Sequence, residues 1–410
     1  MAEQETEHPQ AAAPAEAIPA SGKENVYVLK ERYSIDFSTP MVWLDSNGGK
    51  AYKVEDKIND KRELFALVCN NKTSPRSSLL PYLKSIEHQG IMKLVEYGII
   101  SYPLENSRNM ALIYETPLGG RVIDSNGNYS LKNQPDKFKN TLLSLLSVTE
   151  VLRGYGITHR AIRPENIYYC DEARENIILG DCIASFPAFH QPAAFETIES
   201  LAAMKEGRGN GNEKNDIYAV GAVMLQLYLG HPLLNELTDT EVLRLKLKKG
   251  SYSTLLDNDK VSMYYGNIFR GLLNDDEENR WTYSQTYSIL EGKTITSTPT
   301  SNERPKKSLT INNEKVYTTS DVSYALSQNP EEAYELLRSG KITDWIKNGL
   351  ENEKLNTQID KLLHTGGENA SGKDLIISKL CILLNPRMPI KFKNLCFFPG
   401  GISKALFYAI

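Results

Sequence analysis

The chain has 410 residues, a formal net charge of −4 at pH 7 and an apolar content of 40%. This length allows two folded units with a tail. Lysines and arginines are scattered rather than gathered in a stripe, so the composition does not indicate a nucleic-acid partner. The five cysteines form no C-x-x-C pair, which argues against a disulfide framework and a structural zinc and favours a reducing, cytoplasmic location. No apolar run reaches the roughly 20 residues that a membrane-spanning helix needs.

The first part of the chain combines a polar tail with strand patterns. Residues 1–22 carry acids and no long apolar core, which predicts a disordered tail rather than a signal peptide. Residues 26–54 alternate in polarity and contain the turn SNGG, which predicts a small antiparallel sheet. Two further strand candidates cover residues 93–102 and 109–115, before the breaker TPLGGR. Residues 23–117 are therefore expected to form one lobe.

One helix is expected within this lobe. In the run DKRELFALVC, the apolar residues Leu64, Leu67 and Val68 recur at helical spacing. The sequence therefore predicts a helix from about residue 61.

The next part reads as helical. Apolar residues recur at helical spacing over residues 138–155, and the pattern stops at Gly154. A second apolar helix, residues 216–229, is closed by Gly230. Residues 118–292 are therefore expected to form a helical lobe.

The last part is expected to be a separate unit. Residues 293–310 are polar and without periodicity, which predicts a linker. Asn329 and Pro330 mark a strong helix start, so residues 311–410 are expected to form a mostly α-helical module. Its final residues are apolar up to Ile410, which predicts that the tail docks or that the natural chain continues.

The most specific pattern is ITHRAIRPENIYYCDEARENIILGDC, residues 157–182. It contains His159 and Arg160, then Asn166 seven places after the histidine, then Asp181 behind an apolar strand. This spacing resembles the catalytic loop H-R-D-x-x-x-x-N and the metal loop D-F-G of eukaryotic-like protein kinases. In that pattern the first Asp orients the substrate hydroxyl, and the Asn and second Asp hold Mg²⁺. Here Ala161 stands in place of the first Asp.

The resemblance covers residues 26–291 and implies an α+β fold. It implies a bilobal protein-kinase-like architecture, with an antiparallel sheet plus helix in the N-lobe and a helical C-lobe, followed by the mostly helical C-terminal domain. The run FETIE, followed by GRGNG and NDIYAVGAV, looks like bacterial kinase-like proteins of the alphaproteobacterial sort.

The resemblance also implies a seat for ATP and Mg²⁺. Lys53, at the end of a strand, falls in the place of the lysine that grips the phosphates, with Glu63 as its partner on the following helix. Glu115 and Thr116 fall in the hinge, where backbone groups would face an adenine. The metal-holding residues would be Asn166 and Asp181.

Three departures bear on activity. General-base help is typically worth about 10² to 10⁴-fold, and Ala161 cannot supply it. The segment LKERYSIDFSTPM, where a glycine-rich loop should cover the phosphates, has no glycine, so close backbone approach to phosphate is hindered. Arg163 replaces the lysine that stabilises the transferred phosphoryl group. The loss of the base together with the glycine loop argues against ordinary protein phosphorylation, whereas Arg163 retains positive charge beside the γ-phosphate position, so nucleotide binding need not fail.

The remaining matched residues are expected to be structural. His159 and Arg160 belong to the loop itself, and Asp216 would brace its backbone. Glu199 stands where the Glu of the A-P-E motif would, with Arg280 as its partner. Such an ion pair anchors a lobe without doing chemistry.

Three functions remain open on this reading. The first is a pseudokinase that holds ATP and Mg²⁺ and acts as a regulatory or scaffolding protein through protein partners. The second is an enzyme of kinase fold with altered phosphate chemistry, either slow protein phosphorylation or AMP transfer. The third is an interaction domain that binds no nucleotide.

Overall fold

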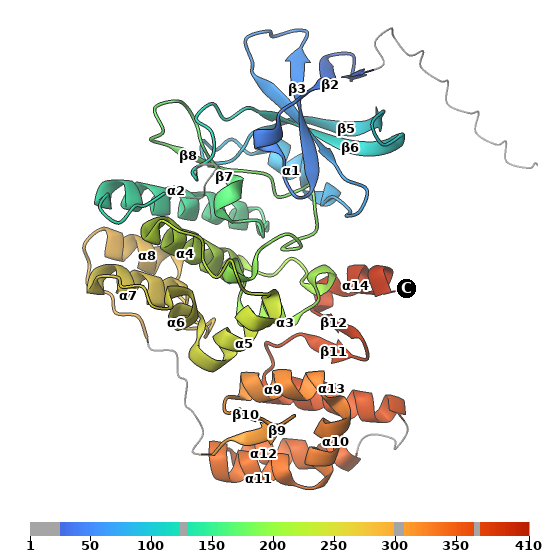
Figure 1. Cartoon of the computed structure of the whole chain (residues 1–410), viewed down its shortest axis with the longest axis vertical. Helices are drawn as coiled ribbons and strands as arrows, with labels where there is room; N and C mark the ends of the chain where they lie inside the picture. The colour runs from blue at the N-terminus through green and yellow to red at the C-terminus, as the bar shows by residue number, and fades with distance from the viewer. Residues whose placement is uncertain (1–24, 124–128, 299–306, 365–369, 410) are drawn as a thin grey trace, which may run out of the picture.

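A computed structural model describes residues 25–123, 129–298, 307–364 and 370–409 (Figure 1). The tail predicted for residues 1–22 lies outside the described residues, as does the middle of the predicted linker, residues 299–306. Within the described part, no helix combines the length and apolar character that crossing a bilayer requires.

The N-terminal lobe is built on a six-stranded antiparallel sheet with strand order β1-β2-β3-β4-β6-β5. Its elements are β1 (Val26–Leu29), β2 (Tyr33–Pro40), the 3-10 turn η1 (Val42–Leu44), β3 (Gly49–Asp56), β4 (Leu64–Cys69), η2 (Ser77–Leu79), α1 (Leu80–Ser85), β5 (Leu94–Tyr102) and β6 (Ser107–Glu115). The two edge strands approach each other, because Lys30 beside β1 bonds Glu96 on β5 at 2.7 Å. The sheet is therefore strongly curled around one apolar core and presents its other face to the helical lobe.

The prediction of a helix from residue 61 is wrong. The segment forms strand β4, and all six of its residues are buried. A strand that is covered on both faces reads as a continuous apolar run, which periodicity cannot separate from a short helix. The helix of this lobe is α1, six residues long, and it begins at Leu80. The run MVWL also differs from the predicted strand, since Val42–Leu44 form a helical turn.

The second lobe is helical, as expected. Its elements are α2 (Pro135–Gly154), η3 (Pro164–Asn166), β7 (Ile167–Tyr169), β8 (Ile177–Leu179), η4 (Ala193–Phe195), α3 (Ile198–Ala202), η5 (Lys205–Gly207), α4 (Glu213–Leu229), α5 (Asp239–Lys249), α6 (Ser251–Leu256), α7 (Met263–Leu272) and α8 (Tyr283–Leu290). Helix α4 runs through the core and ends at Gly230 with φ of 84°, the left-handed cap that glycine adopts without strain.

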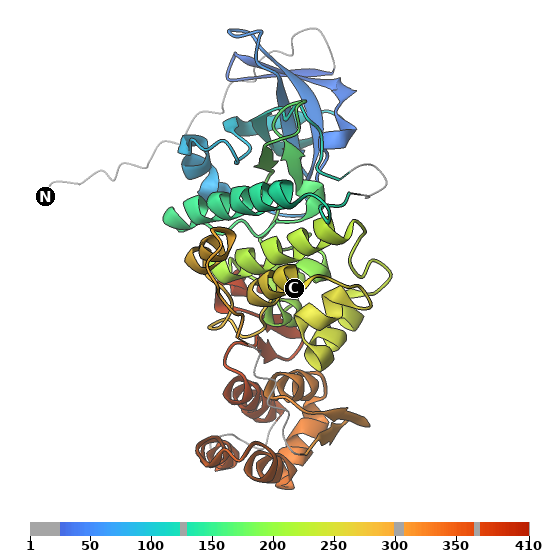
Figure 2. The same cartoon turned by 90° about the vertical axis from the view of Figure 1, so that its left-hand side faces the viewer.

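The C-terminal module has its own apolar core and is mostly helical, with two short hairpins. Its elements are β9 (Leu309–Ile311), β10 (Glu314–Val316), α9 (Thr319–Gln328), α10 (Pro330–Arg338), α11 (Lys341–Trp345), the π-helical turn η6 (Ile346–Leu350), α12 (Glu353–Asp360), η7 (Lys361–His364), α13 (Ala370–Leu384), β11 (Ile390–Phe392), β12 (Leu395–Phe397), η8 (Pro399–Gly401) and α14 (Ile402–Ala409). It follows the helical lobe along the long axis of the molecule (Figure 2).

The end of this module turns back onto the helical lobe. The N–H of Met204 donates to the carbonyl of Cys396 at 2.9 Å, and the N–H of Phe398 donates to the carbonyl of Gly207 at 2.8 Å. Helix α14 then reaches the junction of the two lobes, where Tyr408 contacts the ring of Phe186 and hydrogen-bonds the carbonyl of Lys72. The final segment therefore touches both lobes.

Candidate functional site

The loop that begins at His159 is held from below by Asp216 on α4. Its two carboxylate oxygens accept the backbone N–H groups of His159 at 2.7 Å and Arg160 at 2.9 Å. The Asp216 carboxyl is buried, which raises its pKa, and these two hydrogen bonds oppose that rise. Arg160 takes a left-handed φ of 59°, so this anchoring holds a backbone turn that a non-glycine residue rarely adopts. Asp216 thus occupies the bracing place that the resemblance implies.

His159 joins this loop to the strand that precedes Asp181. Its Nε2 lies 3.1 Å from the carbonyl of Gly180, and its Nδ1 accepts the N–H of Ala161 at 3.2 Å. Burial lowers the pKa of His159 to about 3, so the ring is neutral at physiological pH. With Nδ1 accepting, Nε2 carries the proton and donates to Gly180. The histidine is a structural link.

Asn166 uses its amide to tie the two loops together. Its Nδ2 donates to the carbonyls of Ala161 at 2.9 Å and Asp181 at 2.8 Å. Its Oδ1 lies against Gly180, where an added Cβ would come within 2.2 Å of that oxygen. The amide nitrogen is therefore committed to backbone contacts.

The carboxylate of Asp181 is occupied by protein donors. Its Oδ1 accepts the hydroxyl of Tyr114 at 2.6 Å and the N–H of Ile183 at 2.9 Å, and its Oδ2 accepts the N–H of Ala184 at 3.0 Å. Tyr114 is buried, and burial together with the Asp181 charge keeps the pKa of its hydroxyl well above the usual value. The hydroxyl of Tyr114 therefore stays protonated and donates its hydrogen bond to Asp181.

Lys53 and Glu63 do not join this group. Lys53 is exposed on β3, and Glu63 is exposed in the connection before β4 rather than on a helix. No ion pair between them is present among the described residues. The physical reason is that residues 64–69 form a strand. The structure therefore has no helix at this place to carry Glu63 toward Lys53.

Cys69 stands where the resemblance places the phosphate-gripping lysine. Strand β4 is the one that precedes the helix of the lobe and pairs with β6, and its last residues, Ala-Leu-Val-Cys, align with the pattern V-A-I-K. Cys69 is 1% exposed, and its burial, with the Asp181 charge nearby, raises the pKa of its thiol well above the ordinary value. Reading ALVC as a strand would have found it.

The hinge uses its backbone donors internally. Its hydrogen bonds run from the N–H of Glu115 to the carbonyl of Lys93 (3.1 Å), from Thr116 to Glu63 (2.9 Å), from Leu118 to Cys170 (3.1 Å) and from Gly119 to Tyr169 (3.2 Å). Pro117 has no N–H to offer. The side chain of Glu115 bonds Arg62 at 2.5 Å. Residues 115–119 therefore keep no N–H group for an adenine in this arrangement.

The connection between β2 and β3 packs into the space between the lobes. The ring of Trp43 lies edge-on to Tyr168 with centroids 6.5 Å apart, and the guanidinium of Arg121 donates to the carbonyl of Asp45 at 2.7 Å. A Cβ at Gly48 would lie 2.9 Å from the Cβ of Ala184, so this segment sits directly on the loop after Asp181.

Little room is left beside Asp181. The cavity behind it, lined by residues that include Leu94, Tyr114 and His159, holds about 10 Å³, at most the space of one water. A more open hollow of about 610 Å³ lies at the hinge between Trp43 and Arg174, and neither Asn166 nor Asp181 lines it.

Arg76, at the start of the segment leading to α1, clamps both loops from the N-terminal lobe. Its guanidinium donates to the carbonyls of Thr158 at 2.9 Å, His159 at 3.0 Å and Cys182 at 3.2 Å. Sequence reasoning missed this residue, because nothing in its local pattern sets it apart from a surface arginine.

Arg163 and Arg280 lie near the loop, and Arg280 does not form the expected ion pair with Glu199. Arg163 is buried, which lowers its pKa, and the Glu165 charge opposes that shift. Arg280 donates to the carbonyls of Asn274 at 2.9 Å and Lys214 at 3.0 Å, and it interacts with Glu199 only through longer-range electrostatics.

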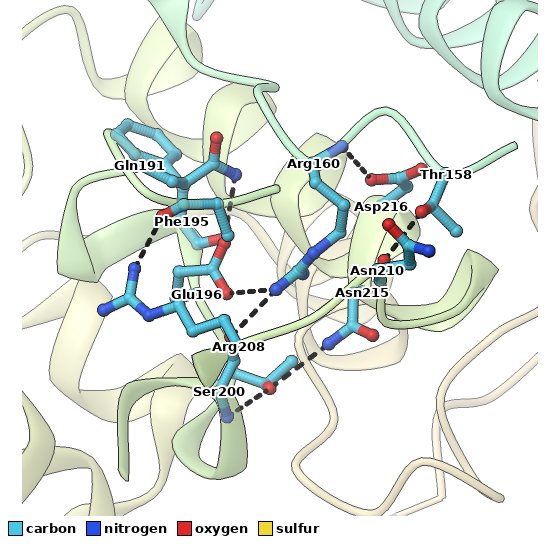
Figure 3. A network of polar contacts seen from close by, with 12 residues as sticks. Thr158, Arg160, Gln191, Phe195, Glu196, Ser200, Arg208, Asn210, Asn215 and Asp216 are labelled. Carbon is cyan, nitrogen blue, oxygen red and sulfur yellow. Dashed lines mark hydrogen bonds and ion pairs between the residues drawn. The ribbon is translucent and has the colours of Figure 1, made fainter. Parts of the chain in front are cut away.

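The buried ion pair of this region joins Arg160 to Glu196 at 3.0 Å, and Arg160 also donates to Ser200 at 2.9 Å (Figure 3). Sequence reasoning missed Glu196. The signal that could have found it is the run Ala194-Phe195-Glu196, which matches A-P-E more closely than the sequence around Glu199 does.

These residues leave a Mg²⁺-nucleotide few free ligand atoms as they stand. Asp181 already accepts three hydrogen bonds, and the amide nitrogen of Asn166 donates to two backbone carbonyls. In the part of the chain that the structure describes, no group of three or more His, Cys, Asp or Glu side chains is arranged to hold a metal. The arrangement can fasten two loops together, and it lacks a group placed to accept a hydroxyl proton.

Comparison with known proteins indicates a protein-kinase-like chain. No family model matches it. It is 22% identical over 282 residues to calcium/calmodulin-dependent protein kinase type 1 of Macrobrachium nipponense, covering 64% of this chain and 73% of that protein. It is 24% identical over 276 residues to the probable serine/threonine-protein kinase fhkC of Dictyostelium discoideum, covering 64% and 44%.

A third relative is also a protein kinase. The chain is 25% identical over 199 residues to calcium-dependent protein kinase 5 of Plasmodium berghei, covering 48% of this chain and 33% of that protein. The chain thus spans only a third of that relative's length. The crystal structure of Rad53 1-466 in complex with AMP-PNP matches with a TM-score of 0.43 and 17% identity, over 58% of this chain and 60% of that one. The three relatives are eukaryotic, and the bacterial likeness stays a prediction.

Proposed function

We propose that this protein is a pseudokinase, a kinase-like scaffold that acts through protein partners and whose interlobe space is closed by its own residues. The observation that carries the proposal is the carboxylate of Asp181, which accepts hydrogen bonds from Tyr114, Ile183 and Ala184. In the kinase pattern this aspartate would hold a metal ion. Here its carboxylate binds protein donors from both lobes instead.

The missing groups point in the same direction. Phosphoryl transfer depends on positioning and on positive charge around the phosphates. Ala161 cannot accept a proton, and Cys69 brings no charge where a lysine is expected. The connection between β2 and β3 packs on Ala184 through Gly48. The cleft therefore lacks the general base and one of the positive charges on which transfer depends.

ATP and Mg²⁺, which the sequence resemblance implies, do not enter the proposal as bound cofactors. The hinge N–H groups are internally bonded, so the adenine would have to compete with four backbone hydrogen bonds. The nucleotide-free interaction domain is thus the version of the pseudokinase hypothesis that the geometry favours.

Thermal unfolding of the full chain tests this proposal. A ligand at 100 times its Kd stabilises a protein by about 2.7 kcal/mol, which is easily seen as a rise in Tm. We expect no rise with millimolar ATP, with or without Mg²⁺, in the wild type or in Asp181→Ala. A rise that needs both the metal and Asp181 would overturn the closed-cleft proposal.

Intact mass after incubation with ATP and Mg²⁺ tests the enzymatic alternative. We expect an unchanged mass, and we expect the same of Ala161→Asp because Cys69 still stands where the phosphate-gripping lysine is expected. An added phosphate or AMP on the wild type would favour altered phosphate chemistry. Brisk phosphorylation by Ala161→Asp would show that the loss of the base alone silences the protein.

A further inference from the structure

A second cavity lies outside the interlobe space, where the helical lobe meets the C-terminal module. It has a volume of about 310 Å³. The helical lobe contributes Arg160, Arg208, Arg280 and the glycine- and asparagine-rich loop 209–212, and the module contributes Arg387. The name junction pocket is used below for this cavity.

Two of its arginines are buried with an unused donor. Arg160 and Arg208 are each 3% exposed, and the Nε atoms of both lack a hydrogen-bond partner within the described residues. One further nitrogen of each is engaged, Nη2 of Arg160 with Glu196 and Nη1 of Arg208 with the carbonyl of Ala188 at 2.8 Å (Figure 3). Leaving a buried charged donor without an acceptor is costly, so both arginines indicate a missing acceptor.

The backbone of the loop supplies further unused donors. Arg208 has φ of −65° and ψ of −28°, and Gly209 follows with φ of 64°. This right-handed and left-handed succession points consecutive N–H groups into one concavity, an arrangement that binds anions. Over the ranges that the structure describes, the N–H groups of residues 208–211 donate to no backbone or side-chain acceptor. The loop and the arginines thus converge on the same space by independent means.

The charge of the junction pocket agrees with an anionic ligand. Four arginines line it, against the carboxylates of Glu199 and Glu277. Burial raises the pKa of Glu199, and Glu277 already accepts the amide of Asn212 at 2.5 Å. Guanidinium groups pair with phosphate oxygens by several parallel hydrogen bonds, which chloride cannot match.

We propose that the junction pocket binds a phosphate monoester. Arg160, Arg208 and the amides of residues 208–211 would take the phosphoryl oxygens, and Arg387 would close the site from the module. A volume of about 310 Å³ exceeds what a bare phosphate fills, so room remains for the esterified group. A free phosphorylated metabolite and a phosphorylated serine side chain present the same chemistry here.

The proposal carries a consequence for the module. The pocket is complete only while the module is docked, because Arg387, Phe398 and Gly400 belong to it. A ligand that binds the docked form alone stabilises that form by mass action. The phosphate group would therefore fasten the module to the helical lobe.

Calorimetric titration of the full chain with inorganic phosphate, O-phosphoserine and serine, at constant ionic strength, tests the proposal. We expect both phosphate probes to bind and serine not to bind. A phosphoserine peptide that binds more tightly than O-phosphoserine identifies a phosphorylated segment as the source, and weaker binding identifies a free metabolite. Absence of heat with both phosphate probes overturns the proposal.

Variants locate the binding. Arg208→Met and Arg387→Gln should each weaken phosphate binding by about tenfold or more, as expected for one charge-assisted hydrogen bond. Arg338→Gln, an exposed arginine on α10 of the same module, should bind like the wild type. Where Arg208→Met fails to fold, Arg387→Gln decides, since its side chain is 42% exposed. Wild-type affinity in Arg387→Gln would overturn the assignment.

Discussion

The interlobe cleft and the junction pocket treat their polar groups in opposite ways. In the cleft, Asp181 accepts three hydrogen bonds and the hinge N–H groups are bonded internally. In the junction pocket, the Nε atoms of Arg160 and Arg208 have no acceptor in the described structure. Native proteins rarely leave buried donors without an acceptor. The unbonded Nε atoms therefore favour ligand binding in the junction pocket over binding in the interlobe cleft.

The largest expected effect concerns the buried pair beside the pocket. Glu196 is 0% exposed and bonds Arg160 at 3.0 Å, so Glu196→Gln leaves a buried guanidinium without its counter-charge. We expect the free energy of unfolding to fall by about 3–5 kcal/mol in urea denaturation. Added phosphate should recover part of that loss by neutralising Arg160. Glu335→Gln, an exposed acid on α10, is the control, and equal stability of the two variants would contradict the role of the pair.

The next prediction tests whether the packing of Gly48 on Ala184 closes the interlobe cleft. A side chain at Gly48 meets Ala184, so Gly48→Val should lower stability by about 1–3 kcal/mol through overpacking. Gly154→Ala is the control, since nothing lies within 4 Å of its added Cβ. A rise in Tm with ATP and Mg²⁺ that appears only in Gly48→Val would identify this segment as what closes the cleft. Undiminished stability would show that the segment does not pack there in solution.

A third prediction uses pH. The pKa of His159 is lowered to about 3 in the folded state, whereas an unfolded histidine titrates near about 6.5. Between these values the unfolded state binds a proton that the folded state refuses, so stability falls as pH drops below about 6.5 and is unaffected above it. The share of His159 is a slope of up to about 1.4 kcal/mol per pH unit. Stability curves of the wild type and His159→Gln measured between pH 7 and pH 4 should converge at low pH, and parallel curves would contradict this account.

The smallest effect separates docking from anion binding. Asp276 bonds Arg387 at 2.6 Å, with 30% and 42% of the two side chains exposed. Because exposed ion pairs contribute little, Asp276→Asn should cost less than about 1 kcal/mol in urea denaturation. The freed Arg387 should bind phosphate at least as well as before in calorimetry. A tenfold weakening would mean that Asp276 positions Arg387 for the ligand.

The two lobes could be predicted from sequence where strong local signals exist. Helix α2 ends at Gly154 and α4 is capped by Gly230, because glycine stops are encoded in a few neighbouring residues. The nature of β4 could not be predicted, since six buried apolar residues satisfy strand and helix patterns alike. That single ambiguity displaced the expected lysine site from Cys69 to Lys53.

The candidate site followed the same division. The loop motif led to His159, Asn166 and Asp181, because their spacing along the chain is short and specific. The partners of these residues could not be read in advance. Tyr114 lies 67 residues from Asp181, and such contacts depend on how the lobes meet rather than on local pattern.

The C-terminal segment that returns to the helical lobe is synthesised last, although it completes the hydrogen bonding of that lobe. Cys396 hydrogen-bonds Ala202, a residue 194 positions earlier, and its carbonyl accepts the N–H of Met204. Chains leave the ribosome N-terminus first and their domains fold as they emerge. The helical lobe is therefore synthesised long before its partner segment, and during that interval residues 202–207 present unpaired backbone groups to the surrounding cell.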